Sequence, residues 1–305
     1  MSVPEVSIVM RSFNEAWALG DTLATLRKQI GPAWELIVID SGSTDGSVEM
    51  IRKFGPAHFV QIQNRDYVPG RVMNHGMRLA RANKVLFLNA DATPANENWL
   101  KPLADALQHP NVAAVFGRQI PRPDCRAVFA CDYERCFSEN RESANWDHFF
   151  SMVSSGLRKD IWSRRGFLEN LQYAEDDEYT RWAKANGFEV AYCSESVAVH
   201  SHNYTALQAY KRAHGDAKAL AASWPGKAAE FNWPKTVALG WAKDFRHDVA
   251  FCLKHGRVGE LGHAANIRWN QRRGRLDGFR DGWNTYRSSS AKPAAMAVHP
   301  NPRAA

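Results

Sequence analysis

Long hydrophobic runs are missing from this sequence, and so is a basic leader at its N-terminus. The apolar stretch from Val3 to Met10 is short and is interrupted by Glu5, which does not fit a signal peptide. No stretch approaches the roughly 20 apolar residues of a membrane-spanning helix. We therefore expect a cytoplasmic protein whose contact with a membrane is limited to the surface of the inner face.

Cysteines are few, and several common binding motifs are absent. The five cysteines are odd in number and none forms a Cys-x-x-Cys pair, so the sequence supports neither a disulfide framework nor a zinc site. No Gly-x-Gly-x-x-Gly follows the first expected strand and there is no Gly-x-x-x-x-Gly-Lys-Ser/Thr, which argues against dehydrogenase-type and P-loop nucleotide binding. No nucleic-acid-binding motif accompanies the basic residues, so we expect no nucleic-acid partner.

The excess of positive charge lies in the C-terminal region. The net charge is +7, and residues 226–305 contain 14 Lys and Arg against 6 Asp and Glu, giving +8 and leaving about −1 for residues 1–225. Apolar residues recur about once per turn from Val237 to Leu253 and from Leu261 to Trp283, which predicts two helices with basic residues beside the apolar stripe. Such a pair either lies on an anionic membrane surface or packs on the rest of the chain or on a second subunit.

The first hundred residues alternate between buried strands and amphipathic helices. Strands rich in Val and Ile are expected near residues 5–12, 35–39, 58–62 and 85–88, and this alternation predicts a mostly parallel α/β sheet. We expect an α/β domain over residues 1–225, a basic amphipathic helical region over 226–287 and a disordered, Ser-, Pro- and Ala-rich tail over 288–305.

Three of the expected strands end in polar loops, at residues 12–15, 40–45 and 89–93. The carboxyl ends of parallel strands share one edge of a sheet, where ligands bind in open α/β folds, so Asp40 and Asp91 are expected to face one crevice. Such carboxylates suit a nucleotide base or ribose at one point and a divalent cation on a phosphate at another. The alternative for Asp91 alone is a turn or helix-capping residue.

Two expected helix starts also contain residues that suit anion binding or proton transfer. Arg71 and Asn74 lie in the first turn of an expected helix, whose N-terminus favours an anion such as a diphosphate. The alternative there is a surface helix with a solvated arginine. Four consecutive acidic residues at 175–178 begin another expected helix. They complement its dipole, but crowding also raises the pKa of carboxyl groups, as a general base near neutral pH requires.

Three of these stretches together resemble a known family. Val6–Glu15, Val38–Ser47 and Leu88–Pro94 are similar to successive motifs of the family 2 inverting glycosyltransferases, which have the GT-A fold, and the Asp-x-Gly-Ser-Thr-Asp-Gly-Ser pattern of the second is the most specific. The element Gly-Arg-x-x-Asn-x-Gly resembles the rhamnosyltransferase-like branch, although Pro69 replaces a histidine of that branch. The resemblance covers roughly residues 5–215 with specific motifs.

The resemblance implies where the donor and its metal bind. It places the following residues in the nucleotide-sugar site: Ser12, Phe13, Glu15, Asp40, Arg71, Asn74, Asn89 and Ala90. Asp91 would be the metal-binding carboxylate of an Asp-x-Asp motif and would hold Mn²⁺ or Mg²⁺. Asn89 replaces the first Asp of that motif, which leaves a single metal carboxylate. His200 and His202 share one face after a strand, and we prefer His200 as the further ligand; the alternative is a structural role.

The same resemblance implies a role for the acidic helix start at residues 175–178. A Glu-Asp pair opens the helix beneath the acceptor in this family, and its Asp is the general base. This makes Asp176 the base and Glu175 its neighbour, with Asp177 as the second choice because the register is ambiguous by one residue.

The leading hypothesis is an inverting glycosyltransferase that moves a sugar from a nucleotide-diphosphate donor to a hydroxyl of a glycan or lipid-linked acceptor. A sugar-nucleotide pyrophosphorylase would need a Gly-rich phosphate loop, which Arg11–Asn14 does not supply. The second alternative is a non-catalytic nucleotide-sugar- or glycan-binding module, which Asn89 motivates. A homo-oligomer is compatible with either.

Overall fold

The computed structural model describes residues 3–223 and 231–288, which group into two compact units. The sheet unit contains residues 3–122, 135–171 and 175–200. The helical unit contains residues 123–134, 172–174, 201–223 and 231–288. No helix in these ranges combines the length and the apolar character needed to cross a bilayer.

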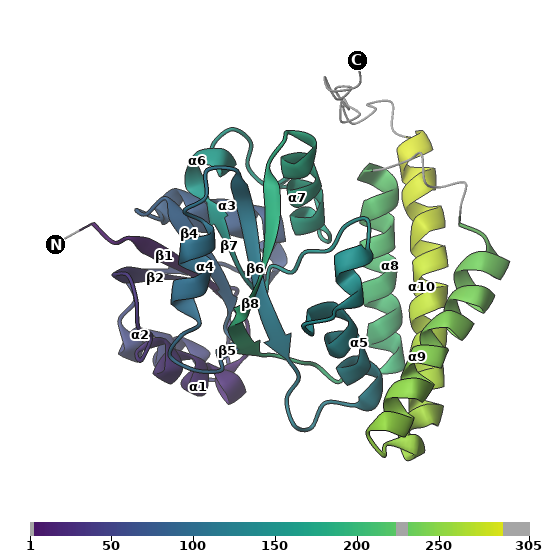
Figure 1. Cartoon of the computed structure of the whole chain (residues 1–305). Helices are drawn as coiled ribbons and strands as arrows, with labels where there is room; N and C mark the ends of the chain where they lie inside the picture. Colours follow the sequence, from purple (N-terminus) through teal and green to yellow (C-terminus); the bar gives the residue numbers. More distant parts are fainter. Residues whose placement is uncertain (1–2, 224–230, 289–305) are drawn as a thin grey trace. The chain divides into compact units, whose positions relative to one another are not determined.

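Among the described residues, eight strands form one sheet in the order β3-β2-β1-β4-β7-β6-β8-β5 (Figure 1). Neighbouring strands are parallel except where β7 pairs with β4 and β6 and where β5 pairs with β8, so the expected mostly parallel α/β fold is confirmed. The strands are β1 (Val6–Ser12), β2 (Trp34–Asp40), β3 (His58–Gln61), β4 (Lys84–Asn89), β5 (Thr93–Pro94), β6 (Val112–Ile120), β7 (Ser154–Arg158) and β8 (Glu189–Val199).

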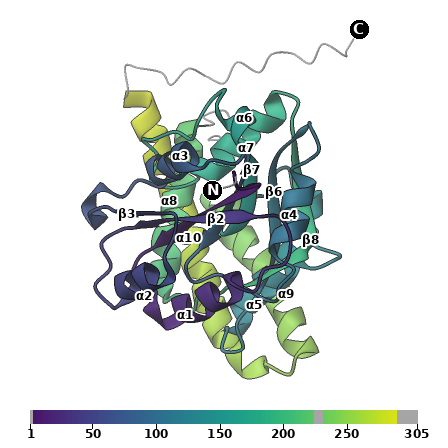
Figure 2. The same cartoon turned by 90° about the vertical axis from the view of Figure 1, so that its left-hand side faces the viewer.

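Helices cover both faces of this sheet, which explains why β1, β2 and β4 are apolar runs and not alternating patterns. Ile8 and Met10 of β1 pack in one apolar cluster with α1 (Ala16–Leu26), α2 (Ser47–Phe54) and α4 (Leu100–Ala106). Val9, between them, packs on the opposite face with α3 (Pro69–Leu79) and α7 (Glu175–Ala185). Figure 2 shows α1 and α2 on one side of the strands and α3, α7 and the short α6 (Lys159–Trp162) on the other.

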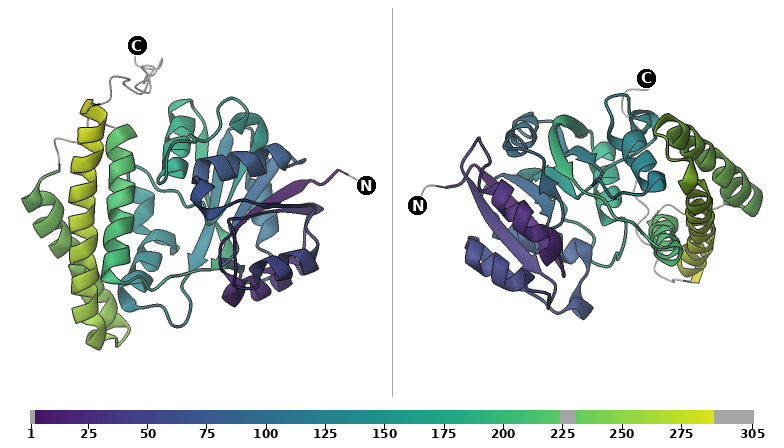
Figure 3. Two further views of the ribbon diagram at one scale, coloured as in Figure 1. Left: turned by 180° about the vertical axis from the view of Figure 1, so that it is seen from behind. Right: turned by 90° about the horizontal axis from the view of Figure 1, so that it is seen from below.

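The helical unit is built around two long helices that lie side by side, α8 (Ala206–Ser223) and α10 (Leu261–Ser288) (Figure 3). Gly274, Gly278 and Gly282 of α10 lie on its α8 side. A Cβ atom added to them would come within 2.3, 2.1 and 2.3 Å of the carbonyl oxygens of residues 210, 214 and 218. The two backbones are therefore in direct contact. The other elements of the unit are η4 (Trp233–Leu239), α9 (Gly240–Lys254), η5 (Val258–Glu260) and most of α5 (Ala127–Phe137).

A buried charge network joins three helices of this unit. The guanidinium of Arg268 on α10 donates to both carboxylate oxygens of Asp248 on α9 and of Asp132 on α5, with all four distances 2.8 Å. Arg268 is almost fully buried and Asp248 completely so. The Arg268 cation compensates the charge of Asp248, which is too deeply buried to be hydrated, and the network connects α10 to α9 and α5.

The compact units divide the chain at other positions than the division expected from the sequence, which stays a prediction. The main segment of the helical unit begins at Ser201, and the unit also includes residues 123–134 and 172–174. The physical reason is that α8 supplies the backbone surface against which the α10 glycines pack. α10 continues to Ser288, and residues 289–305 of the expected tail lie outside the described residues.

Candidate functional site

The polar loops after β1, β2 and β4 meet at one edge of the sheet. Ser12 pairs with Asp40 across β1 and β2, and Arg11 pairs with Asn89 across β1 and β4. This is the common edge predicted from the parallel strands. A cavity of about 270 Å³ opens there, lined by Arg11, Ser12, Phe13, Glu15, Ser41, Asn64, Tyr67 and Asn89.

The second of these loops holds the first in place. Ser43 Oγ accepts a hydrogen bond from the main-chain N–H of Asn14 (2.8 Å), and Asp45 accepts one from the N–H of Ala16 (2.8 Å). In return, Asn14 Oδ1 accepts a hydrogen bond from the N–H of Thr44 at 2.8 Å. Ser43 and Asp45, through their side chains, and Thr44, through its main chain, thus fix the loop that lines the cavity.

Arg11 lies at the centre of the site. Its Nη2 donates to the side-chain oxygen of Asn89 at 2.8 Å, and its Nη1 lies 3.4 Å from the Tyr67 hydroxyl. Burial opposes its charge, but Tyr67, Glu175, Asp176 and Glu15 raise the pKa of Arg11 above its ordinary value. This cation therefore links the loop after β4 to the acidic start of α7.

Asp91 and His200 form a buried pair at the same edge. His200 Nε2 lies 3.5 Å from Asp91 Oδ2, and both side chains are almost fully buried. His200 Nδ1 lies 3.0 Å from Gln119 Oε1, and the Gln119 amide nitrogen in turn donates to Ser151 Oγ at 2.8 Å. The Gln119 oxygen accepts, so Nδ1 carries a proton, and Nε2 is the ring nitrogen that faces the Asp91 carboxylate.

Glu15 adds a second acidic group to this region. Burial and then the charge of Asp91 raise the pKa of Glu15 to about 8, and Arg11 opposes this shift. Its Oε2 atom is buried and makes no hydrogen bond within the part of the chain that the structure describes. A second negative charge beside Asp91 is thus costly here unless a cation compensates it.

The acidic residues at the start of α7 have different partners. Asp177 accepts a hydrogen bond from Arg181 Nε at 2.8 Å and lies 3.5 Å from His148, while Glu178 is buried against Arg165. Asp176 instead accepts a hydrogen bond from the main-chain N–H of Asp177 at 2.8 Å. Burial raises the pKa of Asp176, the Asp177 charge adds to this, and Arg11 opposes it.

Comparison with known proteins agrees with this geometry. Residues 7–165 match the family model described as glycosyl transferase family 2. The chain belongs to glycosyl transferase family 2. It is 28% identical over 221 residues to the O-antigen chain rhamnosyltransferase RfbN of Salmonella typhimurium, covering 68% of this chain and 70% of that protein. It is also 28% identical to WbaN of Salmonella anatum, over 69% of this chain and 70% of that one.

Solved structures show the same fold. The mannosyltransferase PcManGT from Pyrobaculum calidifontis, in complex with GDP-Man and Mn²⁺, matches with a TM-score of 0.61 at 18% identity, over 93% of this chain and 88% of that one. Residues 1–349 of S. aureus TarS, in complex with UDP, match with a TM-score of 0.53 at 17% identity, over 93% and 91%. The GT-A fold of this glycosyltransferase is confirmed.

Several residues expected to bind the donor have internal partners. The Asp40 carboxylate accepts hydrogen bonds from Gly42, Ser43 and Gln61. The side-chain amide of Asn74 is buried, and all of its hydrogen-bonding capacity is used within the chain. Its nitrogen donates to Phe167 and Glu169, and its oxygen accepts from Trp162 and Phe167. Asn74 thus anchors the segment 162–169, and donor contacts by either residue stay a prediction.

The remaining expected donor residues differ in exposure. Arg71 is more than half exposed and its Nε lies 3.9 Å from Glu169. Phe13 is exposed at the rim of the cavity, while Ser12 and Ala90 are buried. Arg71 is therefore available to a ligand, whereas Ala90 can offer only its main chain.

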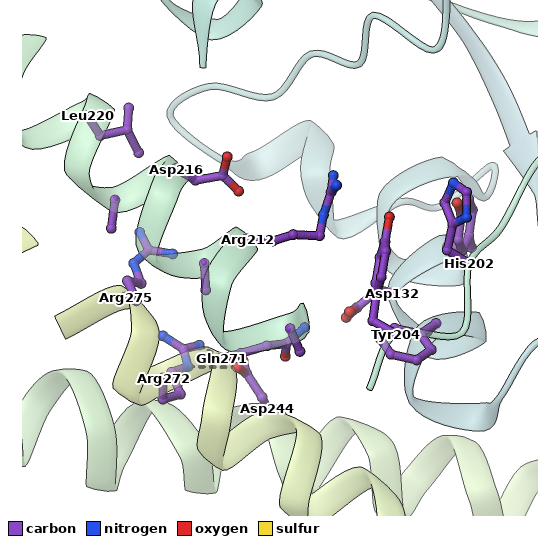
Figure 4. Close-up of a pocket in the computed structure, with 15 residues that line it drawn as sticks. Asp132, His202, Tyr204, Arg212, Asp216, Leu220, Asp244, Gln271, Arg272 and Arg275 are labelled. Carbon is purple, nitrogen blue, oxygen red and sulfur yellow. Dashed lines mark hydrogen bonds and ion pairs between the residues drawn. The ribbon is translucent and has the colours of Figure 1, made fainter. Parts of the chain in front are cut away.

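His202 belongs to the helical unit. Its ring lies 5.3 Å from that of Tyr204, and both line a cavity of about 380 Å³ (Figure 4). Arg212, at 4.8 Å over the Tyr204 ring, and Arg272, which pairs with Asp244, also line this cavity. A role for His202 as a metal ligand stays a prediction.

Arg11 and Gln119 are site residues that the sequence patterns did not predict. Arg11 carries a detectable signal, because it is a charged residue near the end of a strand that is otherwise buried. Gln119 carries none, since its importance depends on the His200 ring, 81 residues later in the chain.

Proposed function

We propose that this glycosyltransferase moves a deoxyhexose of the rhamnose type from a nucleotide-diphosphate donor to a hydroxyl of a glycan or lipid-linked acceptor, with inversion. Two relatives are named rhamnosyltransferases, and solved neighbours carry GDP-Man or UDP. The observation that carries the proposal is the sheet edge, where the Asp91–His200 pair and the cavity around Arg11 are found in one unit.

The residues present fit a divalent metal. Gln119 accepts a hydrogen bond from His200 Nδ1, so Nε2 and a carboxylate oxygen of Asp91 face each other at 3.5 Å, and a metal cation would take the place of a proton between them. Asp91 and His200 would hold Mn²⁺ better than Mg²⁺, because imidazole is a poor ligand for the harder ion. When bound, the metal would offset charge on the departing diphosphate.

Asp176 serves as the general base. Its raised pKa brings a carboxylate closer to neutral pH, where proton acceptance is most effective. The acceptor hydroxyl passes its proton to Asp176 while its oxygen bonds to the anomeric carbon. The carbon–oxygen bond to the diphosphate breaks, and the diphosphate leaves with the electron pair. A single displacement of this kind inverts the anomeric configuration.

The first test separates the base from its neighbour. Asp176→Asn should lower kcat by roughly 10²–10⁴-fold, which is the usual size of a general-base contribution. Donor binding should not weaken. Asp177→Asn is the matched control, because it removes the same charge one residue later from a carboxylate that pairs with Arg181. Near-normal turnover of Asp176→Asn, or a larger loss in Asp177→Asn, would reassign the base.

The second test addresses the donor and the metal. Calorimetric titration with UDP, dTDP and GDP, in Mn²⁺ and then in EDTA, should show metal-dependent binding of one nucleotide. Asp91→Asn should remove the metal dependence. Nucleotide-sugar binding without transfer or hydrolysis over long incubation would favour the non-catalytic binding module.

A further inference from the structure

The outer face of η4 and α9 combines apolar and basic side chains. Leu239 and Leu253 are 65% exposed, and Trp233 is 51% exposed. On α9, Lys243 and Arg246 follow Leu239 at intervals of four and three residues, so the exposed leucines and these cations share one stripe of the helix. Lys235, also exposed, lies about one turn before Leu239.

The acidic residues of the same helix point the other way. Asp244 and Asp248 are buried, and they pair with Arg272 at 2.6 Å and with Arg268 at 2.8 Å. Within residues 231–258, therefore, every exposed charged side chain belongs to a Lys or an Arg. Lys254 pairs with Glu134 at 2.7 Å, whereas Lys235, Lys243 and Arg246 make no ion pair with the described residues.

We propose that this face, defined by Trp233, Lys235, Leu239, Lys243, Arg246 and Leu253, docks on an anionic lipid bilayer. Exposed apolar side chains at this density are costly in water, and burying acids while displaying cations suits a negatively charged surface. Trp233 is of the residue type that is enriched at the level of lipid headgroups. The proposal rests on the surface of the helical unit alone and does not depend on the transfer reaction.

The test is sedimentation of the full chain with lipid vesicles. The chain should bind vesicles of phosphatidylcholine mixed with phosphatidylglycerol, and bind poorly to phosphatidylcholine alone. Each Lys or Arg near an anionic surface strengthens partitioning about fivefold, so Lys235→Glu, Lys243→Glu and Arg246→Glu together should weaken binding by roughly 100-fold or more. The matched control reverses Lys28, Lys53 and Lys184, which are exposed elsewhere in the chain.

The apolar contribution has its own control. Leu239→Gln with Leu253→Gln should weaken binding roughly tenfold. Leu207→Gln, at a side chain that is 61% exposed on α8, should leave binding unchanged. Quenching of tryptophan fluorescence by brominated lipid should fall in Trp233→Phe.

Two results would overturn the proposal. One is equal binding to neutral and anionic vesicles, or equal loss in the two triple variants. The other is a dimer in light scattering that Leu239→Gln and Leu253→Gln convert to a monomer, since the face would then belong to a second copy of this chain.

Discussion

Replacing Gly278 by Ala tests the contact between α8 and α10 most directly. An alanine Cβ at this position would lie 2.1 Å from the carbonyl oxygen of His214 and 2.8 Å from its carbonyl carbon, more than 1 Å short of ordinary contact for the oxygen. Both are backbone atoms of a helix and cannot rotate away. The helices must therefore separate along a line that also includes Gly274 and Gly282.

The expected magnitude follows from two opposing effects. Alanine is preferred over glycine in a helix interior by about 1 kcal/mol. Overpacking of a tight interface costs about 1–3 kcal/mol, and a backbone clash lies at or above the upper end. We expect Gly278→Ala to lower the free energy of unfolding of the helical unit by about 2 kcal/mol.

Gly262→Ala is a matched control in the same helix. Within the described part of the chain, nothing lies within 4 Å of a Cβ added to Gly262, so this change should stabilise the unit by a few tenths to about 1 kcal/mol. Urea denaturation followed by circular dichroism, with hydrogen exchange of amides 206–223 to isolate the helical unit, measures both. If Gly278→Ala is as stable as Gly262→Ala, the two backbones are not in contact and the reasoning fails.

Three further predictions concern charge. Arg268→Met should cost about 3–5 kcal/mol in urea denaturation, because Asp248 would remain buried without its cation; a loss below 1 kcal/mol would contradict this. Burial lowers the pKa of His148 to about 4, so between about pH 6.5 and 4 the unfolded chain binds a proton that the folded chain does not, and stability should fall by up to about 3 kcal/mol as the pH drops through that window. His148→Gln should flatten this dependence, and an unchanged profile would assign it to other groups. Asn89→Asp adds a carboxylate two residues before Asp91 and should tighten Mn²⁺ binding roughly tenfold in calorimetry; unchanged affinity would mean that Arg11 neutralises the new charge.

The sequence was sufficient to predict the sheet and the edge at which its polar loops meet. Apolar runs that end in polar loops fix strand positions, and parallel pairing then requires that Asp40 and Asp91 lie on one edge, as the register shows. The family motifs followed from local residue order alone.

The partners of individual side chains could not be predicted in this way. Asn74 was expected at a diphosphate because it lies near a helix N-terminus, yet its amide is saturated by Phe167, Glu169 and Trp162, more than 85 residues away in the sequence. The choice between Asp176 and Asp177 depends on which carboxylate pairs with Arg181, and the sequence gives no rotamers.

The sequence by itself thus determined the α/β fold, the family and the sheet edge at which the candidate site lies, because these depend on periodicity and on local motifs. Only the tertiary structure decided that α8 packs with α10, that Gln119 orients His200, and that α9 buries its aspartates while exposing its cations. The physical reason is that hydrogen bonds, ion pairs and burial join residues across long stretches of chain, and their directions exist only once the backbone is folded.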